Sequence, residues 1–237
     1  MDVDTRLAED WVRAIAAAVE REHERLTELD SAIGDGDHGS NLRRGFAAVL
    51  AALDSPDPAP DSPDSPDSPA GPAPDGGPGA LLTRTGSTLI SKVGGASGPL
   101  YGKAFRAIGA ALPPPGRPGA DAAGLGEALA AGLRAVRDLG RAAPGDKTVV
   151  DAWTPALDAY REAVAAGAGL PEATAAAAGG AERGALDTVP LQARKGRASY
   201  LGPRSVGHQD PGAASTALLF RALAEATAAR AAARGGS

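Results

Sequence analysis

The sequence predicts an all-helical fold, and three observations lead to this expectation. Hydrophobic residues make up 43 % of the 237 residues, yet aromatic residues make up only 3 %, so small aliphatic side chains must build the core. Alanine has the highest helix propensity, because its methyl side chain loses no rotamer freedom when a helix forms. No run of four or more β-branched and aromatic residues alternates with polar ones, as an amphipathic strand would require.

Eight helical segments are expected along the chain. The first covers residues 5–26, where apolar side chains recur at roughly the helical period of 3.6 residues: Leu7, Trp11, Ile15, Val19 and Leu26. The others are expected at residues 40–53, 81–93, 99–112, 121–139, 146–166, 171–186 and 211–233. Three prolines suit a first helical turn, where a missing N–H costs nothing: Pro99, Pro171 and Pro211.

Residues 54–80 are rich in proline and aspartate, and we expect them to form a disordered insert between the second and third helices. Proline lacks the N–H that a helix needs, and the repeated acidic residues cannot be buried. The remaining ~200 residues suit one core. We therefore expect a single domain over residues 1–237 that carries this insert.

Composition excludes several classes of protein. Without cysteine the chain has neither disulfides nor thiolate metal sites, so a metal must bind to oxygen or imidazole. The net charge of −5 and the pI near 5.3 argue against nucleic-acid binding. The N-terminus lacks the pattern of a signal peptide, and no uncharged apolar run approaches ~18 residues. A soluble, cytoplasmic protein that does not contact membranes is expected.

The most informative segment covers residues 30–41, D-S-A-I-G-D-G-D-H-G-S-N. Asp30, Asp35 and Asp37 would repel one another unless a cation neutralised them, and the intervening glycines allow the tight turns that bring carboxylates together. Hard oxygen ligands suit Mg²⁺, which often completes its shell with substrate phosphates. A solvated turn between two helices is the alternative, but the polar residues that follow at a helix start favour a binding site.

Three familiar patterns do not apply to this chain. Residues 34–39 match G-x-G-x-x-G, but they follow a helix and lack a βαβ context. Residues 98–103 are one residue short of a P-loop, and Ala104 stands where Ser or Thr is needed. An EF-hand loop counted from Asp30 would end at Asn41 instead of Glu.

Further glycine-rich or basic segments suit anion binding. G-G-A-S-G-P at residues 94–99 and G-D-K-T at residues 145–148 each open a helix, whose N-terminus favours negative charge. Both could also be ordinary caps. R-K-G-R-A-S-Y at residues 194–200 supplies cations, and H-Q-D-P-G at residues 208–212 precedes the last helix. The polar connection that contains these last two segments is long enough to suggest a function.

Together these segments resemble the L subunit of dihydroxyacetone kinase, its nucleotide-binding subunit. The resemblance rests on L-D-S-A-I-G-D-G-D-H-G-S-N, G-G-A-S-G-P-L-Y-G, G-D-K-T-V-V-D-A-W and A-R-K-G-R-A-S-Y-L-G-P-R-S-V-G-H-Q-D-P-G-A, in family order between residues 29 and 213. It implies a barrel of eight antiparallel, amphipathic helices with a nucleotide site in the loops at one end. The insert is longer than the family pattern.

The resemblance also assigns roles to individual residues. It implies that Asp30, Asp35 and Asp37 bind two Mg²⁺ ions that bridge the phosphates of ADP or ATP. Further residues are expected to line the nucleotide: His38, Gly39, Ser40, Asn41, Ala96, Ser97, Gly140, Thr148, Val149, Arg197, Asp210, Pro211 and Gly212. No catalytic residue separate from this site is expected. Phosphoryl transfer depends mainly on positioning and charge neutralisation, which such a site would provide.

By the same resemblance, the acceptor dihydroxyacetone is held covalently by a histidine of a separate K subunit, so this chain is expected to act only with that partner. The residues leave open whether ATP is consumed or a bound ADP is rephosphorylated by a phosphotransferase-system subunit. Two alternatives also stay open: a kinase domain for another small acceptor, such as a different ketose or a fatty acid, and a non-catalytic nucleotide sensor.

Overall fold

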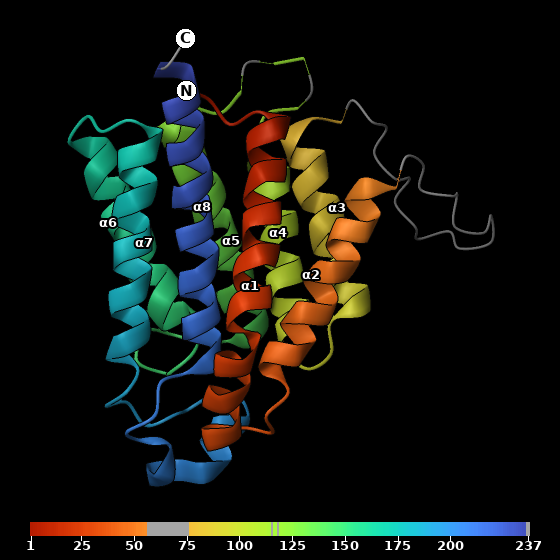
Figure 1. Cartoon of the computed structure of the whole chain (residues 1–237). Coiled ribbons are helices and arrows are strands. Elements are labelled where there is room, and N and C mark those ends of the chain that lie inside the picture. Colours follow the sequence, from red (N-terminus) through yellow and green to blue (C-terminus); the bar gives the residue numbers. More distant parts are fainter. Residues whose placement is uncertain (56–75, 115, 118, 236–237) are drawn as a thin grey trace.

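The computed structural model describes residues 1–55, 76–114, 116–117 and 119–235. Within these ranges the chain forms eight α-helices, one 3₁₀ helix and no strand (Figure 1). The helices are α1 (Thr5–Ile33), α2 (His38–Asp54), α3 (Gly77–Lys92), α4 (Ser97–Ala111), α5 (Ala122–Gly140), α6 (Val149–Ala165), α7 (Leu170–Asp187), η1 (Arg197–Ser205) and α8 (Pro211–Gly235). The predicted all-helical fold is confirmed.

The α-helices form a closed ring. Each of them packs against the next one along the chain, and α8 packs against both α7 and α1. Successive helices run in opposite directions, and both chain termini lie at the upper end in Figure 1. The connections α1–α2, α3–α4, α5–α6 and α7–α8 therefore all lie at the lower end, and we call this the site end.

Two predicted boundaries are wrong, and one element was not predicted. Helix α1 continues to Ile33 instead of ending at residue 26, because Leu26 and Ile33 keep the apolar spacing and both are buried. Helix α3 begins at Gly77, inside the range expected for the insert. Residues 56–75, which make up most of that predicted insert, lie outside the described residues. The unpredicted element is η1.

A small set of large side chains organises an otherwise small-residue core. Trp11, Phe46 and Phe105 bring α1, α2 and α4 together, with ring centroids 5.4 Å apart for Trp11–Phe105 and 6.4 Å apart for Phe46–Phe105. The indole N–H of Trp11 donates to the carbonyl oxygen of Leu219 in α8 at 3.0 Å. Burying these aromatic side chains stabilises the barrel and fixes α1 against α8.

Glycine allows α3 and α4 to lie in close contact. A Cβ atom at Gly86 would overlap the carbonyl oxygen of Gly102, and a Cβ at Gly102 would press on the carbonyl oxygen of Gly86. Backbone-to-backbone packing of this kind is possible only between residues without side chains. It positions the C-terminus of α3 and the N-terminus of α4 side by side at the site end.

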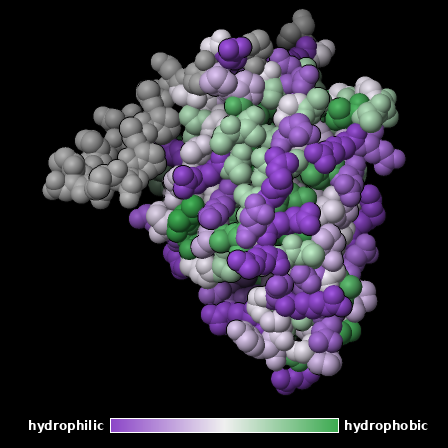
Figure 2. Space-filling view, turned by 180° about the vertical axis from the view of Figure 1, so that it is seen from behind, coloured by the Kyte–Doolittle hydropathy of each residue, from purple (hydrophilic) through white to green (hydrophobic). Residues whose placement is uncertain are grey.

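On the back face of the molecule, hydrophobic residues form small patches separated by hydrophilic ones (Figure 2). Among the described residues, none of the helices combines the length and the apolar character needed to cross a membrane.

Candidate functional site

Asp30 lies in the last turn of α1, and its carboxylate organises the start of α2. The side chain is only 8 % exposed. Its Oδ2 accepts hydrogen bonds from the backbone N–H groups of Asp37 at 2.9 Å and His38 at 3.2 Å. The first N–H groups of a helix have no partner within the helix, so this carboxylate serves as a cap supplied by the preceding helix.

Three carboxylates converge at this point, and we call Asp30, Asp35 and Asp37 the acidic cluster. One oxygen from each lies within 4.8 Å of the others. The turn between them includes Gly36 at φ +73°, a conformation that favours glycine. Such a group of hard oxygen donors fits Mg²⁺, because a divalent cation would offset the repulsion between the carboxylates.

Arg197 of η1 forms an ion pair with the acidic cluster. Its Nη2 lies 3.1 Å from Oδ2 of Asp35, and both side chains are partly exposed. The pair brings the 3₁₀ helix to the edge of the cluster from the α7–α8 connection, residues 188–210. An exposed pair of this kind contributes little to stability, so Arg197 can exchange this carboxylate for another anion at low cost.

A cavity of ≈ 270 Å³ lies beside the acidic cluster at the site end. It joins segments that are far apart in the sequence. The predicted site residues that line it are Asp30, Asp35, Asp37, His38, Ala96, Ser97, Gly140, Thr148, Val149, Arg197, Asp210, Pro211 and Gly212. The structure therefore brings the predicted segments into one place, including the isolated Gly140.

Three predicted site residues do not line the cavity. A Cβ atom at Gly39 would overlap the carbonyl oxygen of His23, so Gly39 faces α1 and allows the two helices to touch. Ser40 is exposed, and its hydroxyl donates to the carbonyl oxygen of Asp37 at 2.9 Å. Asn41 is buried and accepts from Arg44 at 2.6 Å. Their contact with a nucleotide stays a prediction.

Four helices point their N-termini toward this cavity. Helices α2, α4, α6 and α8 all begin at residues that line it or next to such residues. Each N-terminus carries a partial positive charge and N–H groups without a helical partner. At α4, the cap residue Ala96 offers no side-chain hydrogen bond, and Gly95 before it has φ +66°. This turn suits the close approach of an anion such as a phosphate group.

A chain of hydrogen bonds ties three of these N-termini together. The ring nitrogens of His38 in α2 bond with Ser97 Oγ in α4 at 2.9 Å and with Ser215 Oγ in α8 at 2.8 Å. The hydroxyl of Tyr101 continues the chain, 2.7 Å from Ser215 Oγ. Burial lowers the pKa of His38, although Asp30 and Asp37 act against this effect. A neutral imidazole is therefore favoured, and it orients the two hydroxyl groups.

Asp210 caps α8 from a buried position. Its carboxylate accepts from the N–H of Ala213 at 2.7 Å, and its own N–H donates to the hydroxyl of Thr188 at 2.9 Å. Burial raises the pKa of Asp210 to about 7, and the hydrogen bond from Ala213 limits that rise. The sequence left open a cap or a nucleotide contact for this residue. The structure shows the cap, and it places Asp210 in the cavity wall.

Several residues of the cavity wall were not identified from the sequence. Leu100 and Val136 supply apolar surface from α4 and α5, and the buried Lys147, next to Thr148 in the sequence, also lines the cavity. Spacing within G-D-K-T gives no sign that Lys147 is buried, because its partners are backbone carbonyl groups elsewhere in the chain. Leu100 and Val136 belong to no motif. Only their positions in helices, near the site end, could have indicated that they line the cavity.

Fold and site together define an all-helical protein with an acidic cluster beside an end cavity that suits anions. A family model described as the DAK2 domain matches residues 32–225. The ADP-binding subunit DhaL of the PEP-dependent dihydroxyacetone kinase of Escherichia coli K12 is 41 % identical over 215 residues, which cover 91 % of this chain and 93 % of that protein. The corresponding subunit of the PTS-dependent kinase of Lactococcus lactis is 35 % identical. The match covers 96 % of this chain and 100 % of that protein. The chain belongs to the DAK2-domain family.

A solved structure supports the same relationship. The dihydroxyacetone kinase of C. freundii in complex with AMP-PNP and Mg²⁺ matches with a TM-score of 0.62 and 26 % identity. The match covers 95 % of this chain but only 34 % of the solved chain. This chain therefore corresponds to about one third of that longer kinase, and it spans nearly the full length of the DhaL subunits.

Proposed function

We propose that this chain is the nucleotide-binding subunit of a dihydroxyacetone kinase, which transfers a phosphoryl group to dihydroxyacetone held on a separate K subunit. The observation that carries the proposal is the acidic cluster beside a cavity into which four helix N-termini point. The relatives that match over nearly their whole length are named as ADP-binding subunits of such kinases, which supports the choice of nucleotide and of acceptor.

The residues of the site suit a nucleotide whose phosphates face the acidic cluster. The cluster would hold two Mg²⁺ ions, which when bound supply neutralisation of phosphate charge. The N-terminus of α4, with Ala96 and Ser97, would bind phosphate oxygens through its N–H groups. Arg197 would leave Asp35 for a phosphate, and the apolar surface of Leu100 and Val136 would pack against the base.

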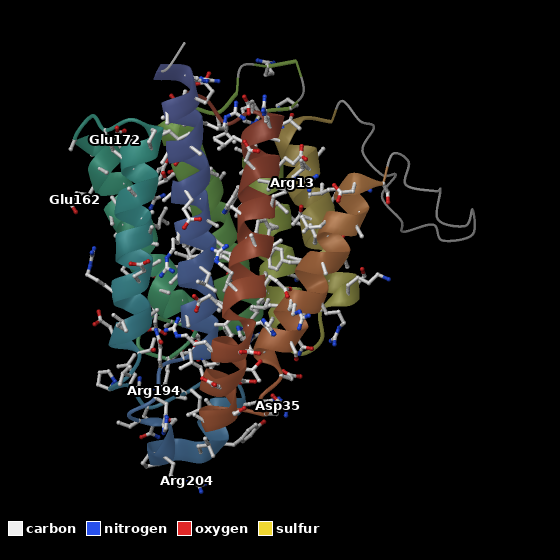
Figure 3. All side chains as sticks on the ribbon, in the orientation of Figure 1. Arg13, Asp35, Glu162, Glu172, Arg194 and Arg204 are labelled. Atoms are coloured by element: carbon white, nitrogen blue, oxygen red, sulfur yellow. The ribbon has the colours of Figure 1, made fainter. Side chains whose placement is uncertain are left out.

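The surface of the site end supports docking of a partner chain over the cavity. Among the described residues, the large hydrophobic side chains that are exposed all lie at this end: Ile90, Leu139, Leu186, Tyr200 and Val206. Arg194 and Arg204 lie at the same end (Figure 3). An exposed apolar rim with cations is typical of an interface, and the acceptor would have to reach the phosphate from this side.

We further propose that ADP stays bound and is rephosphorylated by a phosphotransferase-system subunit. The relatives that match over nearly their full length are named as PEP-dependent or PTS-dependent. A D-erythrulose kinase of Mycolicibacterium smegmatis matches with 36 % identity, but this chain covers only 34 % of it. This relative is the reason to keep an erythrulose acceptor, which the partner chain would select, as the alternative.

Reconstitution tests both steps. The purified chain, loaded with ADP and Mg²⁺, is mixed with a K subunit, dihydroxyacetone and either ATP or phosphoenolpyruvate with the phosphotransferase-system proteins. We expect repeated turnover with phosphoenolpyruvate, and loss of that turnover when this chain carries Asp35→Asn. Repeated turnover on ATP alone would exclude the ADP-cofactor form, and nucleotide binding without transfer under any condition would indicate a sensor.

A further inference from the structure

Lys147 is buried at the site end, and its ammonium group is fully used by the protein itself. Among the described residues no other lysine or arginine is as buried as Lys147, which is 1 % exposed. Its Nζ donates to the carbonyl oxygens of Thr188 at 2.8 Å, Leu191 at 3.1 Å and His208. An ammonium has three N–H groups, so each of them has an acceptor.

These three acceptors lie at the two ends of the α7–α8 connection. Thr188 and Leu191 follow α7, and His208 comes shortly before α8, so one charged group joins the beginning of the connection to its end. Two backbone hydrogen bonds run alongside, from Gly207 N–H to the carbonyl of Val189 at 2.8 Å and from Arg194 N–H to the carbonyl of Asp146 at 3.1 Å.

The α7–α8 connection, which is hydrogen-bonded to Lys147, forms part of the cavity wall. Lys195, Gly196, Arg197 and Ala198 all line the cavity, and all lie between the points that Lys147 holds. Carbonyl groups that are buried without a donor are costly. The loss of this ammonium would leave the partly buried carbonyls of Leu191 and His208 without this donor, and that of Thr188 with the N–H of Leu191 alone. Opening of the connection to water would satisfy the carbonyls that lose their donor.

The local backbone is shaped to place this side chain. Lys147 has φ +63°, in the left-handed region that residues with a side chain seldom occupy. The turn around Lys147 keeps it in this strained conformation. In that turn Thr148 caps α6, and the carboxylate of Asp151 accepts from the N–H of Thr148 at 2.7 Å. A strained residue fixed by its surroundings often marks a functional constraint.

Charge also favours this position. Burial lowers the pKa of Lys147, while the carboxylates of Asp210 and Asp151 act in the opposite direction. Asp210 belongs to the cavity wall and caps α8. The ammonium therefore lies between the α7–α8 connection and the start of α8 as a buried counter-charge, and it has no hydrogen left for a ligand in the cavity.

We propose that Lys147 is a positioning residue that holds the α7–α8 connection over the cavity and thereby sets how slowly bound nucleotide leaves. The role of the ligand rests on the proposed function, whereas the restraint on the connection rests on the contacts of Lys147 alone. Lys147 also lines the cavity, but its three N–H groups are used by the connection, so it would act through the connection and would not donate to the nucleotide.

The test compares Lys147→Met with Lys103→Met, which changes an exposed lysine on α4. Amide hydrogen exchange should become at least about tenfold faster at Arg194 and Gly207 in Lys147→Met, and the helices should be unaffected. The dissociation rate of a fluorescent ADP analogue in Mg²⁺, measured by chase with ADP, should rise about tenfold or more with little change in the association rate. Both rates should be unchanged in Lys103→Met.

A merely structural role would lower thermal stability and leave the dissociation rate of the folded protein unchanged, and that result would overturn the proposal. Unchanged exchange at Arg194 and Gly207 would overturn it as well. If Lys147→Met does not fold, Lys147→Gln keeps two N–H donors and should give an intermediate dissociation rate. If the unmodified chain binds no ADP analogue, the proposed function fails, and hydrogen exchange still decides whether Lys147 restrains the connection.

Discussion

At the end of the barrel away from the cavity, Arg230 of α8 forms ion pairs with two carboxylates near the start of α1, at 2.6 Å from Asp4 and 3.6 Å from Asp10. Arg13, on the upper part of α1 in Figure 3, pairs with Glu9 at 2.9 Å and with Asp54. At the site end, by contrast, the three carboxylates of the acidic cluster share one ion pair among the described residues, from Arg197.

This difference separates charge that is paired within the chain from charge that we propose is available to bind Mg²⁺ and a nucleotide. At the far end each of these arginines has a carboxylate partner within the chain: Arg230 joins α8 to the start of α1, and Arg13 joins α1 to the end of α2. At the site end the carboxylates are held together by backbone geometry, and their repulsion is a cost to the protein without metal. Three close carboxylates with a single arginine partner beside a cavity form an arrangement that a bound divalent cation would stabilise.

The largest expected effect comes from Asp37→Asn in the acidic cluster. The change removes one negative charge while keeping the shape of the side chain. We expect the affinity for ADP in Mg²⁺ to fall by about 1000-fold, because a direct metal ligand should cost more than the 10- to 100-fold typical of outer-shell partners. Titration calorimetry measures this. The melting temperature in a chelator should be unchanged or higher, and a lower one would contradict the repulsion argument.

The buried carboxylate of Asp210 predicts a dependence of stability on pH. Its pKa is raised from 3.8 to about 7 by burial, so between about pH 4 and pH 7 the folded state retains a proton that the unfolded state has released. Stability therefore falls as pH rises through this window and is level above it. The unfolding free energy of the wild type minus that of Asp210→Asn should fall by up to about 4 kcal/mol between pH 4 and pH 7. Urea denaturation at several pH values measures this, and a flat difference would contradict it.

Gly39→Ala tests whether this position serves packing or ligand binding. The added methyl group would overlap the backbone of α1 at His23, so we expect a loss of about 3 kcal/mol in unfolding free energy. Ser40→Ala, one residue further and exposed, should change stability by less than about 0.5 kcal/mol. Chemical denaturation of both variants decides the point. Equal stability of the two would show that α1 and α2 can separate at no cost.

The smallest effect is expected at the far end. Arg230→Met removes ion pairs with Asp4 and Asp10, which are themselves more than 40 % exposed. A loss of about 1 kcal/mol in unfolding free energy is expected from such pairs, with no change in ADP affinity. A clear fall in ADP affinity would contradict the view that the far end serves stability alone.

Much of the barrel could be predicted from the sequence, because apolar spacing and prolines at first turns mark helices locally. The end of α1 could not be predicted, since the residues T-E-L-D-S-A-I, which follow Leu26, suit either a helix or an acidic loop. The helix continues because Ile33 is buried against residues of the α7–α8 connection. Helix η1 was missed because Pro203 and Gly202, at φ +56°, interrupt any regular pattern.

The candidate site was predictable to the extent that its residues lie in recognisable segments. The acidic cluster and the α4 N-terminus were found in this way, and they meet at the cavity. Within H-G-S-N the sequence could not separate His38, which faces the cavity, from Gly39, which faces α1, because neighbouring helical residues point about 100° apart. Lys147 was missed because it binds backbone carbonyl groups, which every residue carries.

We propose that the acidic cluster and its cavity hold a nucleotide together with Mg²⁺. Titration of the purified, unmodified chain with ADP, once in Mg²⁺ and once in a chelator, tests it most directly. We expect binding in Mg²⁺ that is at least about 100-fold tighter than in the chelator, because the carboxylates repel phosphates unless a cation lies between them. Equal affinity under the two conditions would contradict it.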